Sequence, residues 1–383
     1  MTIDIKHFLK EHAYRNIPLN FKEGYKLGIY ALEGCNGDNA LAKIQSISAL
    51  CALHTKATYD WKNQGENHEH ILPRNASEQI AGICAAIFEE DIEKSKSGFL
   101  NPKVSYAMDN CGMGGDLVTT ANVSTIAALI ASAGNIPMLK HGSPANADKG
   151  RHGSSDFVEL CGIDTMALKN KVERCLETHN FGYTEALDPN YKHIHLQTHK
   201  IAMLPHMNDI LGPITNPLNP KLHTRRVLGV NHLIDPKIIA EAYLILNKKN
   251  ITNMQHALFV RGLVGNEGVD ELSICKEGTL VTELKGENIL QYKLYPEDFG
   301  LKPVSHYSIS PPENMSKGEF SLKILKGEIS GAPLQMVLAN AALLFYLGEK
   351  SNDLKECYQI AEQIQNSGEA YKKMLKIAEY LPK

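Results

Sequence analysis

The chain has 383 residues, of which 43% are hydrophobic and 22% are charged. These proportions are ordinary for a globular protein, and the length predicts two domains. A formal net charge of −3 excludes the overall basic field that holds nucleic acid without sequence preference. No apolar run approaches the roughly 20 residues that span a bilayer, no signal-peptide pattern opens the chain, and the cysteines form no C-x-x-C pair. We therefore expect a cytoplasmic protein with reduced thiols.

The N-terminal part of the chain is expected to be mainly helical. Apolar residues recur at helical spacing over 21–30 and again over 39–53. The stretch 55–76 is polar and rich in Asn, His and Glu, which predicts either an inserted loop or a frayed helix extension. A further helix is predicted over 77–88, and 95–104 is predicted to be a linker.

Beyond about residue 105, short apolar runs alternate with helical segments. Strands are predicted over 104–108, 136–139, 226–230 and 257–260, and helices over 126–133, 157–161, 203–210, 236–246 and 334–347. The 203–210 helix is expected to end at Leu211, Gly212 and Pro213. The alternation predicts an α/β fold with a central, mainly parallel sheet flanked by helices.

A glycine-rich run, DNCGMGGD at 109–116, is the most informative motif. It follows a predicted strand, and TANVST at 120–125 then opens a predicted helix. Glycines let backbone N–H groups approach a ligand, and a helix N-terminus adds partial positive charge, so the segment predicts a phosphate or pyrophosphate site. A turn without a ligand is the commoner use of such a run, and Thr120 or Asn122 could simply cap the helix.

Two later segments suit the same chemistry. KHGS at 140–143 leads to Lys149 and to GSSD at 153–156, whose basic and polar groups suit an anion. GVDE at 268–271 holds the adjacent carboxylates Asp270 and Glu271, which suit Mg²⁺, although a solvated acidic pair is the commoner alternative. Both phosphate-suited loops follow predicted strands, which is where open α/β sheets bind their ligands.

Together with LGPITNP at 211–217, these motifs come in the order and approximate spacing of the anthranilate phosphoribosyltransferases, which the chain resembles over 15–350. The resemblance implies a small N-terminal α-helical domain, 1–100, completed by helices from 185–220, and a larger α/β domain, 101–383. It also implies an active site between the domains and a homodimer formed through the helical domains. The implied reaction is Mg²⁺-dependent transfer of 5-phosphoribosyl from phosphoribosyl pyrophosphate (PRPP) to an amine, with release of pyrophosphate.

The resemblance assigns roles to individual residues. Those implied to bind PRPP are Gly112, Gly114, Gly115, Asp116, Thr120, Asn122, Val123, Ser124, Thr125, Lys140, Lys149 and Ser154. Backbone N–H groups of the glycine run would hold pyrophosphate, while Asp116 could instead order the turn. The implied Mg²⁺ ligands are Ser124, Asp270 and Glu271. The residues implied to line the acceptor site are His141, Gly142, Ser143, His199, Gly212 and Pro213.

The chain departs from the family on the acceptor side. Ser143-Pro144 stands where the family has Asn-Arg. His199, followed by Lys200, stands where the family has the arginine that pairs with the anthranilate carboxylate. Neither side chain replaces a planar bidentate clamp equivalently. We therefore predict a phosphoribosyltransferase whose acceptor is an aromatic amine or nitrogen heterocycle rather than anthranilate.

Four alternatives stay open. The chain could be a true anthranilate phosphoribosyltransferase of tryptophan biosynthesis, with Lys200 or Arg261 replacing the clamp. It could be a pyrimidine nucleoside phosphorylase-like enzyme, although 122–125 and the acidic pair fit the transferase better. A nucleic-acid-binding relative should be basic and should lack the donor motifs, unlike this chain. Finally, the spacing of His193, His195 and His199 could bind zinc, but no further ligand stands out.

Overall fold

The computed structural model describes residues 3–15, 17–62, 76–96, 98–114, 116, 118–142, 153–185, 191–198, 207–265 and 267–383. The chain divides into two compact units. The smaller unit comprises Met1–Phe99, Ala186–Pro217 and Leu233–Thr252, and the larger comprises Leu100–Glu185, Leu218–His232 and Asn253–Lys383. The last segment of the smaller unit is one that the sequence analysis placed in the larger domain.

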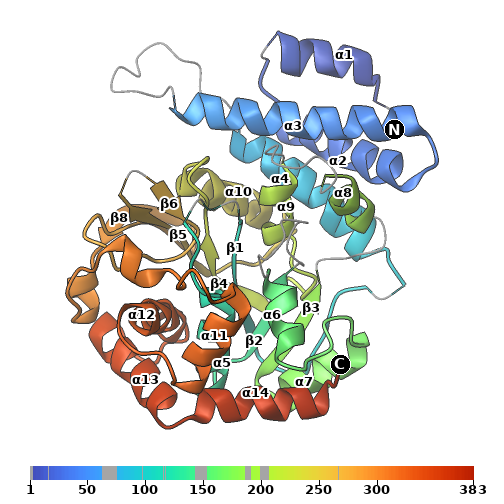
Figure 1. Cartoon of the computed structure of the whole chain (residues 1–383). Coiled ribbons are helices and arrows are strands. Elements are labelled where there is room, and N and C mark those ends of the chain that lie inside the picture. The colour runs from blue at the N-terminus through green and yellow to red at the C-terminus, as the bar shows by residue number, and fades with distance from the viewer. Residues whose placement is uncertain are drawn as a thin grey trace. The chain divides into compact units, whose positions relative to one another are not determined.

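The smaller unit is built of helices (Figure 1). They are α1 (Ile5–Leu9), α2 (Phe21–Asn36), α3 (Ala40–Lys62), α4 (Ala76–Ala86), α8 (Tyr191–Thr198), α9 (Asn208–Ile214) and α10 (Pro236–Lys248). α4 is buried along most of its length because α2, α9 and α10 all pack against it. A capping box between Asn20 and Glu23 starts α2, and Asp235 caps α10 directly before Pro236.

The larger unit holds the sheet. Its strands are β1 (Ala107–Gly112), β2 (Met138–Gly142), β3 (Phe181–Glu185), β4 (His223–Gly229), β5 (His256–Val264), β6 (Glu267–Val269), β7 (Thr279–Lys285) and β8 (Asn288–Leu294). The order is β3-β2-β1-β4-β5-β7-β8, with β6 paired to β5. The first five of these run parallel, whereas β6, β7 and β8 are antiparallel additions. The predicted α/β fold with a mainly parallel central sheet is confirmed.

Helices flank this sheet. They are α5 (Val123–Ala133), α6 (Ser154–Leu160), α7 (Lys169–His179), α11 (Lys317–Lys326), α12 (Ala332–Leu347), α13 (Leu354–Asn366) and α14 (Glu369–Tyr380). α12, viewed almost end-on in Figure 1, packs against α13 and α5. α5 and α12 are apolar and buried on nearly all sides, as expected of helices inside a core. α5 also packs on β1, so the core supports the start of α5 beside the end of that strand.

Several predicted ends are wrong for identifiable reasons. β1 begins at Ala107 and includes Gly112, so the predicted strand over 104–108 lies too early. α5 begins at Val123 because Asn122 occupies its N-cap position. α9 runs through Pro213 to Ile214, whereas the helix was expected to end at Leu211, Gly212 and Pro213. Because a proline has no N–H, α9 lacks one backbone hydrogen bond at Pro213.

Other predicted segments are extended or only partly described. α3 continues to Lys62, so the first part of the polar stretch 55–76 extends that helix, while 63–75 lie outside the described residues. Residues 203–206 of the predicted 203–210 helix also lie outside them. The strands β3, β6, β7 and β8 were not predicted from the sequence. In the part of the chain that the structure describes, no helix is both long enough and apolar enough to cross a membrane.

Candidate active site

The predicted phosphate-binding segments lie at the carboxyl ends of neighbouring parallel strands. The glycine run continues β1, and KHG forms the end of β2. Gly112 at the end of β1 is in register with Gly229 at the end of β4. Because parallel strands end at one edge of a sheet, the loops that follow them meet there.

The glycine run and the acidic pair are in direct contact. The Gly114 N–H donates to Asp270 Oδ2 at 2.6 Å. The Asp270 N–H in turn donates to both carboxylate oxygens of Asp116, at 3.0 and 3.1 Å. Asp116 therefore links the end of the glycine run to the acidic pair and adds a third carboxylate to it. Its contact with PRPP stays a prediction. Gly115 lies outside the described residues.

Two glycines leave room for Asp270. A Cβ on Gly112 would lie 2.0 Å from Asp270 Oδ2, and a Cβ on Gly229 would lie 1.5 Å from the Asp270 carbonyl oxygen. Both distances are far below van der Waals contact. The acidic pair can reach the glycine run only because neither strand end carries a side chain at these positions.

Replacing Gly229 with alanine is expected to lower the free energy of unfolding by about 1–3 kcal/mol, because the Asp270 backbone must move. Urea unfolding measures this loss. Gly37→Ala is the matched control, since a Cβ there would meet its nearest atom at 3.5 Å. Equal unfolding midpoints for the two variants would contradict the close contact.

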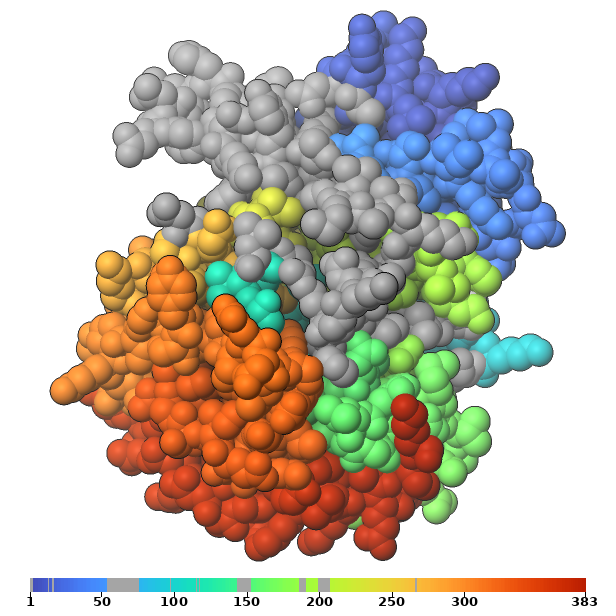
Figure 2. Space-filling model, viewed as in Figure 1, coloured from blue at the N-terminus to red at the C-terminus, as the bar shows by residue number. Residues whose placement is uncertain are grey.

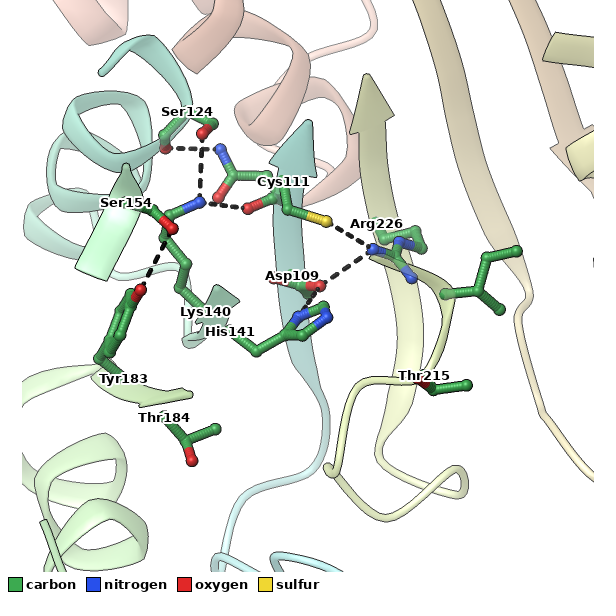
Figure 3. Close-up of polar contacts among 12 residues, drawn as sticks. Asp109, Cys111, Ser124, Lys140, His141, Ser154, Tyr183, Thr184, Thr215 and Arg226 are labelled. Carbon is green, nitrogen blue, oxygen red and sulfur yellow. Dashed lines mark hydrogen bonds and ion pairs between the residues drawn. The ribbon is translucent and has the colours of Figure 1, made fainter. Parts of the chain in front are cut away.

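Lys140 joins the end of β2 to the start of α5 (Figure 3). Its Nζ donates to the Asn110 carbonyl at 2.7 Å and to Ser124 Oγ at 3.1 Å. The Ser124 N–H donates to Glu271 Oε1 at 3.3 Å. Burial lowers the pKa of Lys140. Lys140, Ser124 and Glu271 are thus brought together, as the resemblance implied.

The other polar residues before and within α5 have different surroundings. Asn122 occupies the N-cap position of α5, but its side chain makes no capping hydrogen bond. Its backbone N–H and Nδ2 both donate to Ser321 Oγ, at 2.8 and 3.1 Å. Thr120 Oγ1 donates to the adjacent Ala121 carbonyl, and the buried Thr125 Oγ1 has no hydrogen-bond partner among the described residues.

Burial and neighbouring negative charge disfavour the ionisation of Glu271 and Asp116. Burial first, and then the charge of Asp270, raise the pKa of Glu271 to about 8. The same causes raise the pKa of Asp116 well above its ordinary range. The charges of Lys140 and Lys317 act in the opposite direction on Glu271. A crowded set of oxygen ligands with excess negative charge suits a hard divalent cation.

Ser154 lies on the β3 side of this edge. It is the first residue of α6, and the Tyr183 hydroxyl of β3 donates to its Oγ at 3.2 Å. A Cβ on Gly142 would lie 2.0 Å from the same Ser154 Oγ. Ser154 and KHG are therefore adjacent, while Lys149 lies outside the described residues.

A buried charge network on the opposite face of the sheet was missed by sequence reasoning (Figure 3). Strand register places Asp109 of β1 beside Arg226 of β4. Arg226 Nη2 donates to Asp109 Oδ2 at 3.0 Å, and His141 Nδ1 lies 2.9 Å from the same oxygen. All three side chains are at most 2% exposed. Successive strand residues face opposite sides, so β2 directs Lys140 to the α5 side and His141 to this network.

The network is better described as an ion pair than as a metal centre. Asp109, Cys111 and His141 lie close enough to hold a metal ion. However, the Arg226 guanidinium already donates to Asp109 and, at 3.1 Å, to Cys111 Sγ. Burial, and then the charge of Asp109, raise the pKa of Cys111 to about 12, so the thiol keeps its proton.

Comparison with known proteins gives the family. Residues 105–371 match the model of the glycosyl transferase family, a/b domain. Anthranilate phosphoribosyltransferase from Clostridium kluyveri is 33% identical over 286 residues, which cover 73% of this chain and 78% of that protein. The chain belongs to the anthranilate phosphoribosyltransferase family. The Thermoanaerobacter sp. protein of the same name is 31% identical over 317 residues, covering 81% of this chain and 85% of that protein.

Solved structures of anthranilate phosphoribosyltransferases share the fold. The protein from Thermus thermophilus matches with a TM-score of 0.73 at 25% identity, covering 97% of this chain and 98% of that one. The protein from Saccharomyces cerevisiae, in complex with PRPP and Mg, matches with a TM-score of 0.74 at 20% identity. The match covers 98% of this chain and 97% of that one. As a member of this family, the chain is an enzyme of the phosphoribosyltransferase class.

The acceptor residues implied by the anthranilate phosphoribosyltransferase resemblance are distributed over both units. His141 and Gly142 belong to the larger unit, and Gly212 and Pro213 lie in α9 of the smaller one. Ser143, His199 and Lys200 lie outside the described residues. The structure adds that His141 is buried against Asp109, and its contact with an acceptor stays a prediction.

Proposed function

We propose that this enzyme transfers the 5-phosphoribosyl group of PRPP to an aromatic amine or nitrogen heterocycle other than anthranilate, with Mg²⁺ bound and pyrophosphate released. The proposed binding of PRPP, the phosphoribosyl donor, rests on one observation. Asp116 and Asp270, which are 154 residues apart in the sequence, are in contact beside Ser124 and Glu271. The S. cerevisiae relative, whose fold this chain shares, is in complex with PRPP and Mg. We assign the same donor and cation to the larger unit of this chain.

The residues at the donor site fit Mg²⁺. Asp270 and Glu271 would supply carboxylate oxygens, and Ser124 would supply its hydroxyl. The hydrogen bond from the Ser124 N–H to Glu271 already holds these two ligands together. A divalent cation would relieve the mutual repulsion that raises the pKa of Glu271 and Asp116. When bound, Mg²⁺ supplies neutralisation of the leaving pyrophosphate.

The residues themselves contribute position and charge. As pyrophosphate leaves, ribose carbon 1 becomes cation-like, so preorganised charges and hydrogen-bond donors govern the rate. The Lys140 ammonium, fixed by Asn110 and Ser124, would face the phosphate groups. Backbone N–H groups of the glycine run would hold the pyrophosphate, although the one of Gly114 is already bound to Asp270. No covalent nucleophile is required.

The proposed change of acceptor rests on the absence of the family's arginine that pairs with the anthranilate carboxylate. A carboxylate on an aromatic acceptor calls for a bidentate partner, and the sequence has His199 and Lys200 at that place. An acceptor that lacks this carboxylate does not need the clamp. We infer a heterocycle or aromatic amine recognised through its nitrogen atoms.

True anthranilate phosphoribosyltransferase activity is the second candidate, and the 33% identity to the C. kluyveri protein favours it. Initial rates with PRPP, Mg²⁺ and a panel of aromatic amines, nitrogen heterocycles and anthranilate separate the two. Turnover of anthranilate with a kcat/KM of about 10⁴ M⁻¹ s⁻¹ or more would reject our proposal. Turnover of another amine at that level, with anthranilate inert, is the expected result.

We also propose the homodimer through the helical unit that the resemblance implies. Light scattering of the purified protein is expected to give twice the chain mass of 42.3 kDa. A monomer at micromolar concentration would remove this part of the proposal.

The Mg²⁺ affinity of the enzyme is expected to rise with pH up to about 8. The pKa of Glu271 is raised to about 8, so below that pH the cation must displace a proton from this carboxyl. The Mg²⁺ affinity should rise by at most about tenfold per pH unit, and it should level off above pH 8. Calorimetric Mg²⁺ titrations at pH 6.5 and 8.5 measure the difference. Equal affinities at both values would show that the cation does not bind through Glu271.

A further inference from the structure

α11 meets the donor site from a part of the chain that holds none of the sequence motifs. This helix begins at Lys317, after the N-cap residue Ser316. Ser321, one turn further on, is buried and accepts both hydrogen bonds from Asn122. Because Asn122 is the N-cap residue of α5, the first turns of α11 are fixed against the start of α5.

Lys317 lies on the same face of α11 as Ser321. Residues four apart are neighbours on a helix surface, and helical side chains tilt toward the N-terminus. Lys317 therefore extends beyond Ser321, along the start of α5, where Ser124 contacts Glu271. Electrostatics agrees with this placement, because the charge of Lys317 lowers the pKa of Glu271.

The position of this lysine is unfavourable for the helix itself. A cation at the first helical residue faces the positive end of the helix dipole. Among the described residues Lys317 has no ion-pair partner, whereas Lys323 of the same helix pairs with Glu319 at 3.3 Å. Residues that oppose a local preference are commonly explained by function. At this place the function would be to meet an anion.

We propose that Lys317 is a further pyrophosphate-binding residue, which pairs with the diphosphate group of PRPP beside Ser124 and Glu271. The assignment rests on the proposed donor function. Lys140 is fully buried, whereas Lys317 is partly exposed and can meet a diphosphate that arrives from solvent. An ammonium on a flexible stem suits a polyanion as a point charge.

Calorimetric titration of the full chain with PRPP and with inorganic pyrophosphate, both with Mg²⁺, tests the assignment. Lys317→Gln removes the charge while leaving a polar side chain that is one atom shorter, and we expect it to weaken the binding of both ligands about tenfold. Lys317→Arg is expected to restore most of the affinity. Lys323→Ala, on the same helix, is the matched control and should bind like the unchanged protein.

The readouts separate the possible failures. If Lys317→Gln binds both ligands within twofold of the unchanged protein, while Glu271→Gln does not bind them, the assignment of Lys317 is wrong and the donor site stands. If Lys317→Gln weakens the binding of PRPP but not that of pyrophosphate, Lys317 contacts another part of PRPP, and the diphosphate assignment is wrong. If the unchanged protein binds neither ligand, the proposed donor function itself fails.

Discussion

Glu271→Gln is expected to lower the Mg²⁺-dependent affinity for PRPP and the kcat/KM of the enzyme by about 100-fold or more. The substitution keeps the size of the side chain but removes a negative charge from a ligand that hard cations require. It should also abolish the rise of Mg²⁺ affinity between pH 6.5 and 8.5. Calorimetry gives the affinity, and initial rates with a responsive acceptor give kcat/KM.

The matched control for this experiment is Glu267→Gln. Glu267 is exposed in β6, four residues before Glu271, and no contact ties it to the donor site among the residues that the structure describes. It should leave Mg²⁺-dependent PRPP binding unchanged. If Glu271→Gln binds PRPP as tightly as the control does, the acidic pair is a structural feature and the cation site lies elsewhere.

Arg226→Met is expected to lower the free energy of unfolding by about 3–5 kcal/mol. Arg226 and Asp109 are both completely buried, so removing the guanidinium leaves the carboxylate with His141 as its remaining partner in the network. Urea unfolding near neutral pH measures the loss. The double variant Asp109→Asn with Arg226→Met removes both charges, and we expect it to recover much of the stability.

The same pair predicts a pH dependence. Burial raises the pKa of Asp109, but the neighbouring His141 and Arg226 outweigh this effect and hold it well below the ordinary range. A lowered pKa contributes stability above the unfolded value of about 3.9, and that stability is lost as the pH falls below it. The difference in free energy of unfolding between the unchanged protein and Arg226→Met should therefore become smaller at acidic pH. If this difference in free energy of unfolding is constant from pH 7 to 3, the two residues are not coupled. The same conclusion follows if the losses of stability of the two single variants add up to the loss of the double variant.

Local patterns in the sequence predicted the segments that make up the proposed donor site. A glycine run after β1, polar residues before α5, KHG at the end of β2 and an adjacent acidic pair each point to anion or cation binding without knowledge of the fold. α10 and α12 were also predictable. α10 has an apolar helical period after a capping aspartate and a proline, and α12 is a long apolar run after a proline. In these cases the signal and the structure lie within one short segment.

Contacts between distant segments could not be predicted in this way. Asp109 and Arg226 are 117 residues apart, and only the register of β1 with β4 brings them together. Lys317 appears in the sequence as one of many surface lysines until Ser321 is seen to hold Asn122. Pro213 is a different case, because it lies inside α9 at a place where the usual effect of a proline predicts that a helix ends.

The assignment of residues 233–252 to the smaller unit has a consequence for biosynthesis. α4 leaves the ribosome early during synthesis. α10 is one of the helices that pack on it, and α10 is complete only when Lys248 has been added. Until then the nascent chain exposes the apolar surface of α4 that α10 covers in the folded protein, and exposed apolar surface favours aggregation. For the same reason, a truncation that starts at residue 100 would not yield the larger unit alone. It would retain α8, α9 and α10 without the α2 and α4 surfaces against which they are packed.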